Sequence, residues 1–152
     1  QAVCEGVDSG PSPRGLSAED RRDLSALISE LARIVRRFHR AGYNHRDLYC
    51  CHFFVKEPAA GRREIRLIDL QRVQHRRRFL RRWIVKDLAA LNYSSPGKTI
   101  STTDRMWFFK EYRTVKKIGD NEKSFLREVL KKSRRIALHD AKHRKKTEER
   151  KV

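Results

Sequence analysis

The chain has 152 residues, of which 38% are apolar and 37% charged, and a formal net charge of +18. This length suits one domain with a core and excludes two lobes of ordinary size. No apolar run is long enough to span a membrane, and residues 1–15 lack the regions of a signal peptide. Three cysteines suit neither a disulfide framework nor a zinc cluster, so we expect a reduced, cytoplasmic protein. The high positive charge predicts a polyanionic partner.

A long amphipathic helix is predicted near the N-terminus. Residues 1–16 are rich in Gly, Ser and Pro and predict a linker or hinge. Ser17 and Asp20 form a capping-box pattern, and Gly42 ends the apolar pattern that follows. Apolar residues recur at helical spacing at Leu24, Leu27, Ile28, Leu31, Ile34, Val35 and Phe38.

A β-hairpin is predicted after the polar loop that contains Asp47. The apolar runs 53–55 and 65–68 flank a segment with Pro and Gly at residues 57–61, as two paired strands and their turn would. Asp69 follows the second run directly. The two acids therefore stand at the two ends of one hairpin.

Helices are predicted for most of the remaining chain. A strongly basic stretch occupies residues 71–82, and residues 86–91 predict a short buried helix. Ser101 and Asp104 form a second capping box that opens a further helix, and a last helix begins near Asn121.

The predicted organisation is a linker at residues 1–16, one domain at residues 17–140 and a basic tail at residues 141–152. The tail mixes Lys, Arg and Glu with almost nothing to bury, which predicts a frayed helix or disorder.

Three residues have the spacing that phosphoryl transfer requires. In kinase-like folds one loop contains the Asp that accepts the proton of the attacking hydroxyl, a metal ligand follows five residues later, and a second Asp after the next hairpin binds the metal. Asp47, His52 and Asp69 fit these positions, and His45 and Arg46 complete the tripeptide of the catalytic site. Each also has a purely structural interpretation: Asp47 could form a salt-bridged turn, His52 could be a hydrogen-bonded histidine, and Asp69 could end a strand. Histidine is also an unusual magnesium ligand.

Other residues near these acids allow two interpretations each. Phe54 could form the floor of an adenine pocket or belong to the core. Asp87 could brace the loop around Asp47 through backbone NH groups, or it could be an acid favoured by a helix dipole. We interpret Cys50 and Cys51 as packing residues, because no partner for thiol chemistry accompanies them.

The arginines that follow Asp69 could bind substrate phosphates through bidentate contacts. They include Arg72, Arg76 and Arg77. A solvated basic loop explains them equally well.

A set of motifs in fixed order extends these observations from residue 31 to residue 112. They are Asn44-His45-Arg46-Asp47 with Tyr49, Cys51-His52-Phe53, Ile68-Asp69-Leu70-Gln71-Arg72-Val73-Gln74, Arg82-Trp83, Lys86-Asp87-Leu88, Tyr93-Ser94-Ser95, and Asp104 ahead of Phe108 and Tyr112. In these motifs the chain resembles the lipopolysaccharide core kinases, the Kdo/heptose kinase family of Gram-negative bacteria.

The resemblance implies an α+β, mainly α fold, a protein-kinase-like C-terminal lobe with a small β-hairpin. It implies transfer of phosphate from ATP, with Mg²⁺, to a heptose or Kdo hydroxyl of the lipopolysaccharide inner core. Asp47 would be the catalytic base, and Asp69 and His52 the metal ligands. Tyr49 stands where protein kinases often have a Lys near the transferred phosphate. Arg72 and the arginines after it are therefore candidates for the cation that neutralises the charge of this phosphate. The implied partners are the lipopolysaccharide core/lipid A glycolipid and the anionic surface of the inner membrane, with a peripheral location on its cytoplasmic face.

One departure from the family pattern leaves other functions open. Nothing before Ser17 supplies the Gly-rich loop and strand Lys of an N-terminal lobe, so we expect that lobe to be missing. A catalytically inactive remnant or scaffold is therefore an alternative. A basic nucleic-acid-binding module is another, but the basic segments lack interleaved aromatic residues, so no specific nucleic acid is expected.

Overall fold

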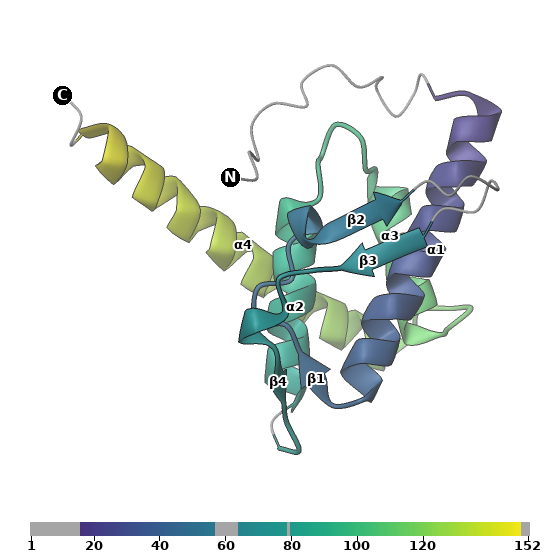
Figure 1. Cartoon of the computed structure of the whole chain (residues 1–152), viewed down its shortest axis with the longest axis horizontal. Helices are drawn as coiled ribbons and strands as arrows, with labels where there is room; N and C mark the ends of the chain where they lie inside the picture. The colour runs from purple at the N-terminus through teal and green to yellow at the C-terminus, as the bar shows by residue number, and fades with distance from the viewer. Residues whose placement is uncertain (1–15, 57–63, 79, 150–152) are drawn as a thin grey trace.

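The fold is mainly helical, as predicted. The structure is a computed structural model that describes residues 16–56, 64–78 and 80–149. Helix α1 packs against α3, and α2 packs against α4 (Figure 1). The helices are α1 (Ala18–Arg40), α2 (Leu80–Ser94), α3 (Thr102–Arg113) and α4 (Asp120–Glu149).

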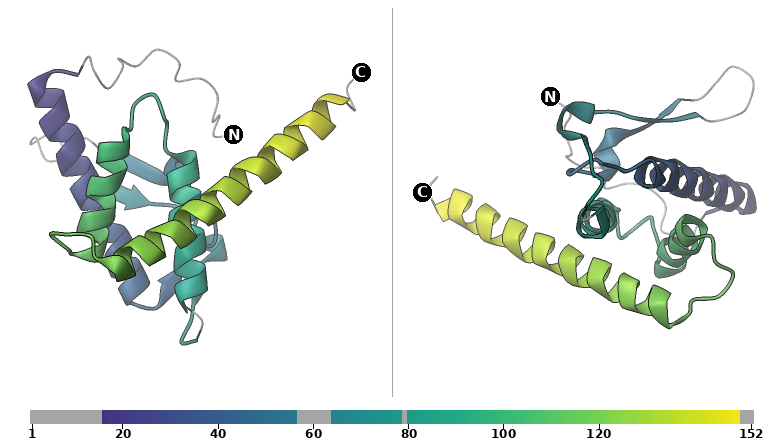
Figure 2. Two further views of the ribbon diagram at one scale, coloured as in Figure 1. Left: turned by 180° about the vertical axis from the view of Figure 1, so that it is seen from behind. Right: turned by 90° about the horizontal axis from the view of Figure 1, so that it is seen from below.

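The predicted hairpin is confirmed. Strand β2 (Phe53–Lys56) pairs antiparallel with β3 (Glu64–Leu67), with Phe53 opposite Leu67. The predicted turn at residues 57–61 lies outside the described residues. The hairpin lies on one side of α1 and α2, while α3 and α4 lie on the other (Figure 2).

A second strand pair was not predicted. Strand β1 (Tyr43–Asn44) pairs antiparallel with β4 (Gln74–His75), which lies within the basic stretch. Two-residue strands are too short to show an alternating pattern. Gly42, with φ +83°, makes the close approach before β1, because a Cβ there would lie 2.8 Å from Nε2 of His75.

Helix α1 forms where the sequence predicts it. Its buried residues, Ile28, Ala32, Val35 and His39, recur at helical spacing, and the capping box at its N-terminus is present. The core joins this face to apolar residues of the other helices, including Leu88, Phe109 and Val129. None of the helices in the described ranges has the length and apolarity needed to cross a membrane.

Two helices are longer than predicted. Helix α2 spans Leu80–Ser94 rather than residues 86–91, because its first turn exposes arginines that resemble a loop in the sequence. Of the two predicted alternatives for the tail, residues 141–149 adopt the helical one, and they continue α4 as an exposed helix projecting from the body (Figure 1). Lys, Arg, Glu and Ala are good helix formers, and they extend a helix that packing against α2 has already nucleated. Residues 1–15 of the predicted linker and residues 150–152 lie outside the described residues.

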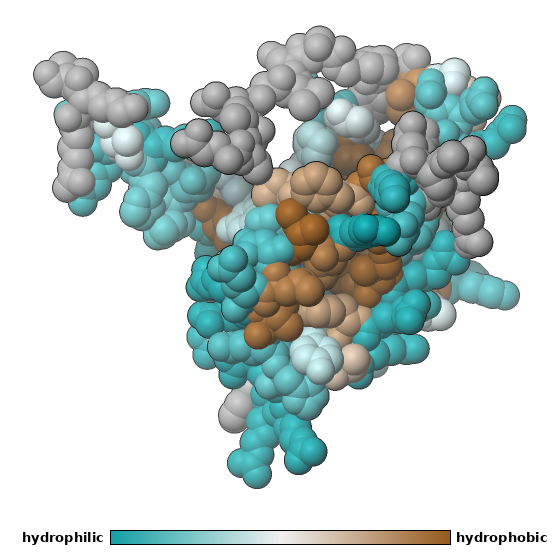
Figure 3. Space-filling model, in the orientation of Figure 1, coloured by the Kyte–Doolittle hydropathy of each residue, from teal (hydrophilic) through white to brown (hydrophobic). Residues whose placement is uncertain are grey.

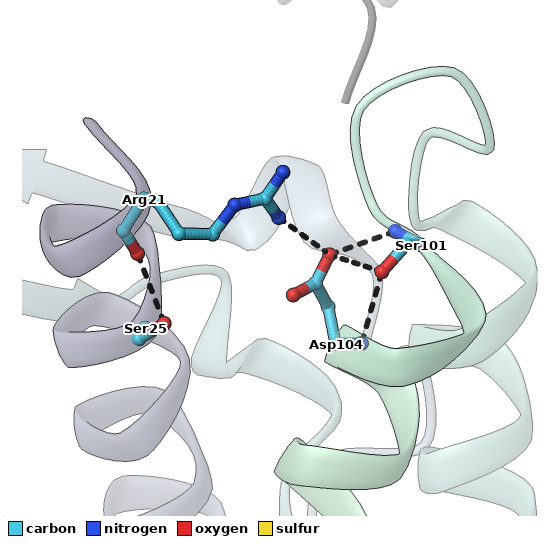
Figure 4. A network of polar contacts seen from close by, with 4 residues as sticks. All are labelled: Arg21, Ser25, Ser101 and Asp104. Carbon is cyan, nitrogen blue, oxygen red and sulfur yellow. Dashed lines mark hydrogen bonds and ion pairs between the residues drawn. The ribbon is translucent and has the colours of Figure 1, made fainter. Parts of the chain in front are cut away.

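The second predicted capping box connects α3 to α1. The NH of Asp104 donates to Oγ of Ser101 at 3.1 Å, and the NH of Ser101 donates to Oδ2 of Asp104 at 2.9 Å. Nη1 of Arg21 on α1 lies 3.7 Å from the same carboxylate oxygen (Figure 4). Because the Asp104 carboxylate is buried, the box fixes where α3 begins against α1.

Ser101→Ala should lower the free energy of unfolding by about 1–2 kcal/mol. The change removes one acceptor of the capping box and a hydroxyl donor to the buried Asp104. Ser17→Ala is the matched control, because the same box at the start of α1 is exposed, and it should cost no more than about 1 kcal/mol. Urea unfolding of both variants measures the difference, and equal costs would contradict the role of burial.

Candidate active site

Asp47 lies in the loop between β1 and the 3₁₀ turn Cys50–His52, beside two cations from distant segments. Arg72 forms an ion pair with its Oδ2, and Nζ of Lys86 on α2 lies 3.7 Å from its Oδ1. The carboxylate is partly exposed, so a hydroxyl could reach it from solvent. Burial lowers the pKa of Lys86, and the charge of Asp47 partly offsets this.

His52 lies between the two predicted acids. Its Nδ1 donates to the backbone carbonyl of Asp47 at 2.7 Å, and its Nε2 lies 3.5 Å from Oδ2 of Asp69. Because a carbonyl only accepts, Nδ1 has to hold a proton. Nε2 then faces Asp69 either as the second N–H of an imidazolium or as a lone pair beside a carboxylate. In the second arrangement, the Nε2 lone pair of His52 and the carboxylate of Asp69 are two metal ligands that could bind one cation.

The backbone around the site adopts unusual conformations. Arg46 has φ +74° and Asp69 has φ +56°, and they are two of the three non-glycine residues with positive φ among those described. Such conformations persist where surrounding contacts enforce them, and they are frequent at functional sites.

Two hydrogen bonds fix the loop against the end of β3. Nε2 of His45 donates to the carbonyl of Ile68 at 3.0 Å, and the NH of Ile68 donates to the carbonyl of His52 at 2.9 Å. The His45 and His52 rings stack with centroids 5.5 Å apart. His45 is fully buried, and a side chain without access cannot touch a substrate, so the prediction that His45 is catalytic is wrong. It positions the segment that precedes Asp69.

Asp87 braces the loop from α2, which is the first of the two interpretations that the sequence allowed. Its carboxylate is fully buried and accepts from the NH groups of His45 at 2.6 Å and Arg46 at 2.8 Å. Nε2 of His39 lies 3.3 Å from the same carboxylate. Three donors therefore share one buried acceptor group directly before Asp47.

Sequence reasoning missed the residues that support Asp87. Nδ1 of His39 lies 2.9 Å from the hydroxyl of Tyr112 on α3. Burial raises the pKa of Tyr112, so its hydroxyl stays protonated and can donate to Nδ1, while Nε2 donates to Asp87. The signal for His39 was its spacing, since it follows Ile28, Ala32 and Val35 on the core face of α1.

Four cations surround Trp83 beside this loop. The ring centroid lies 4.2 Å from Cζ of Arg76, 5.6 Å from that of Arg46, and 5.9 Å from both Cζ of Arg82 and Nζ of Lys86. Arg76 thus stacks on the indole instead of extending into solvent. Arg77, predicted with it, is exposed and is not one of these four.

Phe54 is 56% exposed on the hairpin. Val55, Ile68 and Leu70 are also exposed apolar side chains. The face that contains β2 and β3 shows a patch of apolar surface (Figure 3). The exposure of Phe54 argues against plain core packing in this chain. Cys51 is also exposed, so its interpretation as a packing residue is wrong.

The described residues offer two protein ligands for a cation. No group of three or more His, Cys, Asp or Glu side chains within the described ranges could hold a metal ion. Asp69 and His52 converge, while Asp47 already faces Arg72 and Lys86. Magnesium at phosphate-transfer sites uses one or two carboxylates and completes its shell with phosphate oxygens and water, so this pair fits that use, with the nitrogen donor as its unusual element.

Comparisons with known proteins identify the family of this chain. The Lipopolysaccharide kinase (Kdo/WaaP) family matches residues 16–112. The chain is 39% identical over 122 residues to the lipopolysaccharide core heptose(I) kinase WaaP of Escherichia coli strain K12, covering 77% of this chain and 46% of the relative. Against WaaP of Pseudomonas aeruginosa the identity is 36% over 116 residues, covering 73% of this chain and 43% of the relative.

A solved structure described as "WaaP in complex with acyl carrier protein" superposes with a TM-score of 0.66 at 34% identity, covering 80% of this chain and 52% of the other. The chain therefore spans about half the length of the relatives that it matches. The family match covers more than half of the chain and contains the loop, the hairpin and Asp87. This chain belongs to the lipopolysaccharide kinase (Kdo/WaaP) family.

Proposed function

We propose that this chain provides the catalytic loop and the metal ligands of an ATP-dependent kinase that phosphorylates a heptose or Kdo hydroxyl of the lipopolysaccharide inner core. The observation that carries the proposal is the connection of Asp47 and Asp69 through the single side chain of His52. The names of the relatives support a kinase that acts on this core.

Asp47 accepts the proton of the sugar hydroxyl. Its partly exposed carboxylate can be reached by an acceptor, and the braced loop holds it in one orientation. Bound ATP would supply the phosphoryl group, and bound Mg²⁺ would neutralise its charge. Arg72 and Lys86 lie beside Asp47, where they can stabilise negative charge on the transferred phosphate. Tyr49 has no positive charge for this role, so Lys86 joins Arg72 as a candidate.

Asp69 and His52 hold the metal in this proposal. The left-handed backbone of Asp69 directs its carboxylate toward Nε2 of His52. Phe54, exposed on the adjoining strand, is the candidate floor of an adenine site.

The proposed acceptor is a lipid-linked sugar, which places the enzyme at the cytoplasmic face of the inner membrane as a peripheral protein. The net charge of +18 supports attraction to an anionic lipid surface. Acyl carrier protein is a further proposed partner, from the solved relative. A cavity of about 290 Å³ lined largely by apolar residues, such as Leu31, Leu91 and Phe109, supports a partner that presents an acyl chain.

Asp69→Asn should weaken Mg²⁺-dependent ATP binding by about tenfold or more, because a neutral amide is a poorer magnesium ligand than a carboxylate. Calorimetric titration of the chain with ATP, with and without Mg²⁺, measures this. Binding without Mg²⁺ should be unchanged in the variant.

Asp120→Asn is the control, since it removes the same charge from an exposed position at the start of α4. Failure of the unsubstituted chain to bind ATP under either condition would favour the inactive scaffold. If both variants weaken Mg²⁺-dependent ATP binding equally, the effect of Asp69 comes from its charge alone and Asp69 is not a metal ligand.

A further inference from the structure

A basic groove adjoins the catalytic loop between α2 and α4. It encloses about 800 Å³, and the described residues that form its walls include seven cationic side chains and one carboxylate, that of Glu128. Arg81 forms an ion pair with Glu128 at 2.7 Å, so the single acid is already neutralised. The groove thus has a large excess of positive charge in a concave site.

The wall of the groove nearest the catalytic loop contains several neighbouring cations. Arg46, Arg82 and Lys86 all approach the ring of Trp83, although like charges repel at this range. Nε of Arg46 is buried and has no hydrogen-bond partner among the described residues. A buried guanidinium NH without an acceptor is costly. Arg46 lines the groove, so its positive charge would attract an anion seated there.

The opposite wall is built by α4. Lys131, Lys132 and Arg135 lie within one turn of the helix and line the groove. None of the three has an ion-pair partner within the described part of the chain. They therefore remain available to a ligand.

The groove leads to the catalytic loop through two residues. Lys86 lines the groove while its Nζ lies 3.7 Å from Oδ1 of Asp47. Arg46 also lines it and directly precedes Asp47 in the chain. An anionic group seated in the groove is thus held beside the carboxylate that would receive the hydroxyl proton.

We propose that this groove binds phosphate groups already present on the glycolipid acceptor and so presents a neighbouring sugar hydroxyl to Asp47. This inference rests on the proposed function. Arginine forks and lysine ammonium groups are the side chains that proteins use for phosphate monoesters. A single-stranded nucleic acid fits less well, because Trp83 is the one aromatic side chain that lines the groove among the residues the structure describes, and cations already occupy its surroundings.

The test compares binding of the chain to neutral phosphatidylcholine vesicles that contain one of three lipids. They contain bisphosphorylated lipid A, lipid A from which both phosphates have been removed, or phosphatidylglycerol at equal charge. Co-sedimentation should show binding to the first that exceeds binding to the other two. The variant Lys131→Gln, Lys132→Gln, Arg135→Gln should weaken binding to the first by at least about tenfold. Gln preserves helix propensity, so α4 should remain folded.

A charge-matched control removes three exposed arginines of α1 that do not line the groove, as Arg33→Gln, Arg37→Gln, Arg40→Gln. It should retain phosphate-dependent binding. Equal binding to phosphatidylglycerol vesicles would overturn the proposal in favour of a general membrane surface. Equal loss in the two triple variants would overturn it as well, and so would displacement of the chain from lipid A vesicles by a short single-stranded oligonucleotide at equal phosphate concentration.

Kinetics separate this inference from the proposed function. In the active kinase, the α4 variant should raise KM for the glycolipid by about tenfold or more, with kcat and KM for ATP unchanged. An unchanged KM would overturn the inference. If the unsubstituted enzyme transfers no phosphate to any core sugar, the proposed function fails, and the vesicle experiment still decides whether the groove binds phosphates.

Discussion

Replacing Asp47 by Asn should reduce the rate of phosphate transfer by about 100- to 10,000-fold, the range expected for loss of a positioned general base. The amide has the size of the carboxylate but cannot accept the hydroxyl proton. The backbone of the loop should stay in place, because its bracing hydrogen bonds come from Asp87 and do not involve the Asp47 side chain. Single-turnover transfer from ATP to the core glycolipid, together with the affinity for ATP, measures the effect.

Arg72→Gln distinguishes a catalytic Asp47 from a salt-bridged turn. This variant removes the ion pair to Asp47 but leaves the proton acceptor intact. A smaller loss of transfer than in Asp47→Asn, with similar thermal stability of both variants, would support the base. Transfer at the unsubstituted rate in Asp47→Asn would refute it, and equal losses in the two variants would reduce the role of Asp47 to its ion pair.

The sequence predicted the local parts of the fold because their signals are local. A capping box, an apolar spacing of three to four residues and a stop at Gly42 all occur within the first helix or directly beside it. The hairpin likewise follows from two short apolar runs and the segment between them. The spacing of Asp47, His52 and Asp69 predicted a shared site. In the structure His52 contacts the backbone carbonyl of Asp47 and the carboxylate of Asp69, while the Asp47 carboxylate faces Arg72 and Lys86.

Long-range contacts were beyond such reasoning. The proximity of Lys86 to Asp47 depends on how α2 packs beside the loop, and no local pattern encodes that packing. The same holds for His39, whose partners Tyr112 and Asp87 belong to two other helices. Burial of His45 was also hidden, since its ring is enclosed only when the loop meets the end of β3.

These long-range contacts explain how the loop maintains its conformation. Arg46 has a positive φ, which costs free energy for a residue with a side chain. Hydrogen bonds from the NH groups of His45 and Arg46 to Asp87 offset that cost. Asp87 is in turn held by His39, and His39 by Tyr112, so the loop conformation depends on α1, α2 and α3 together.

Asp87→Ala should therefore lower both stability and activity. The change leaves two backbone NH groups and the His39 ring without their buried acceptor, which should lower the free energy of unfolding by about 3–5 kcal/mol. Transfer per folded molecule should also fall, because the loop is no longer held in the conformation that directs Asp47. Urea unfolding gives the first quantity, and active-site-normalised single-turnover kinetics gives the second.

Asp104→Ala is the matched control, because it removes another buried carboxylate that caps α3 away from the loop. It should destabilise the protein while leaving transfer per folded molecule unchanged. The milder Asp87→Asn keeps one acceptor oxygen and should fall between the Ala variant and the unsubstituted protein in both measurements. If Asp87→Ala and Asp104→Ala lose stability but neither loses transfer per folded molecule, Asp87 holds the core together without positioning the catalytic loop.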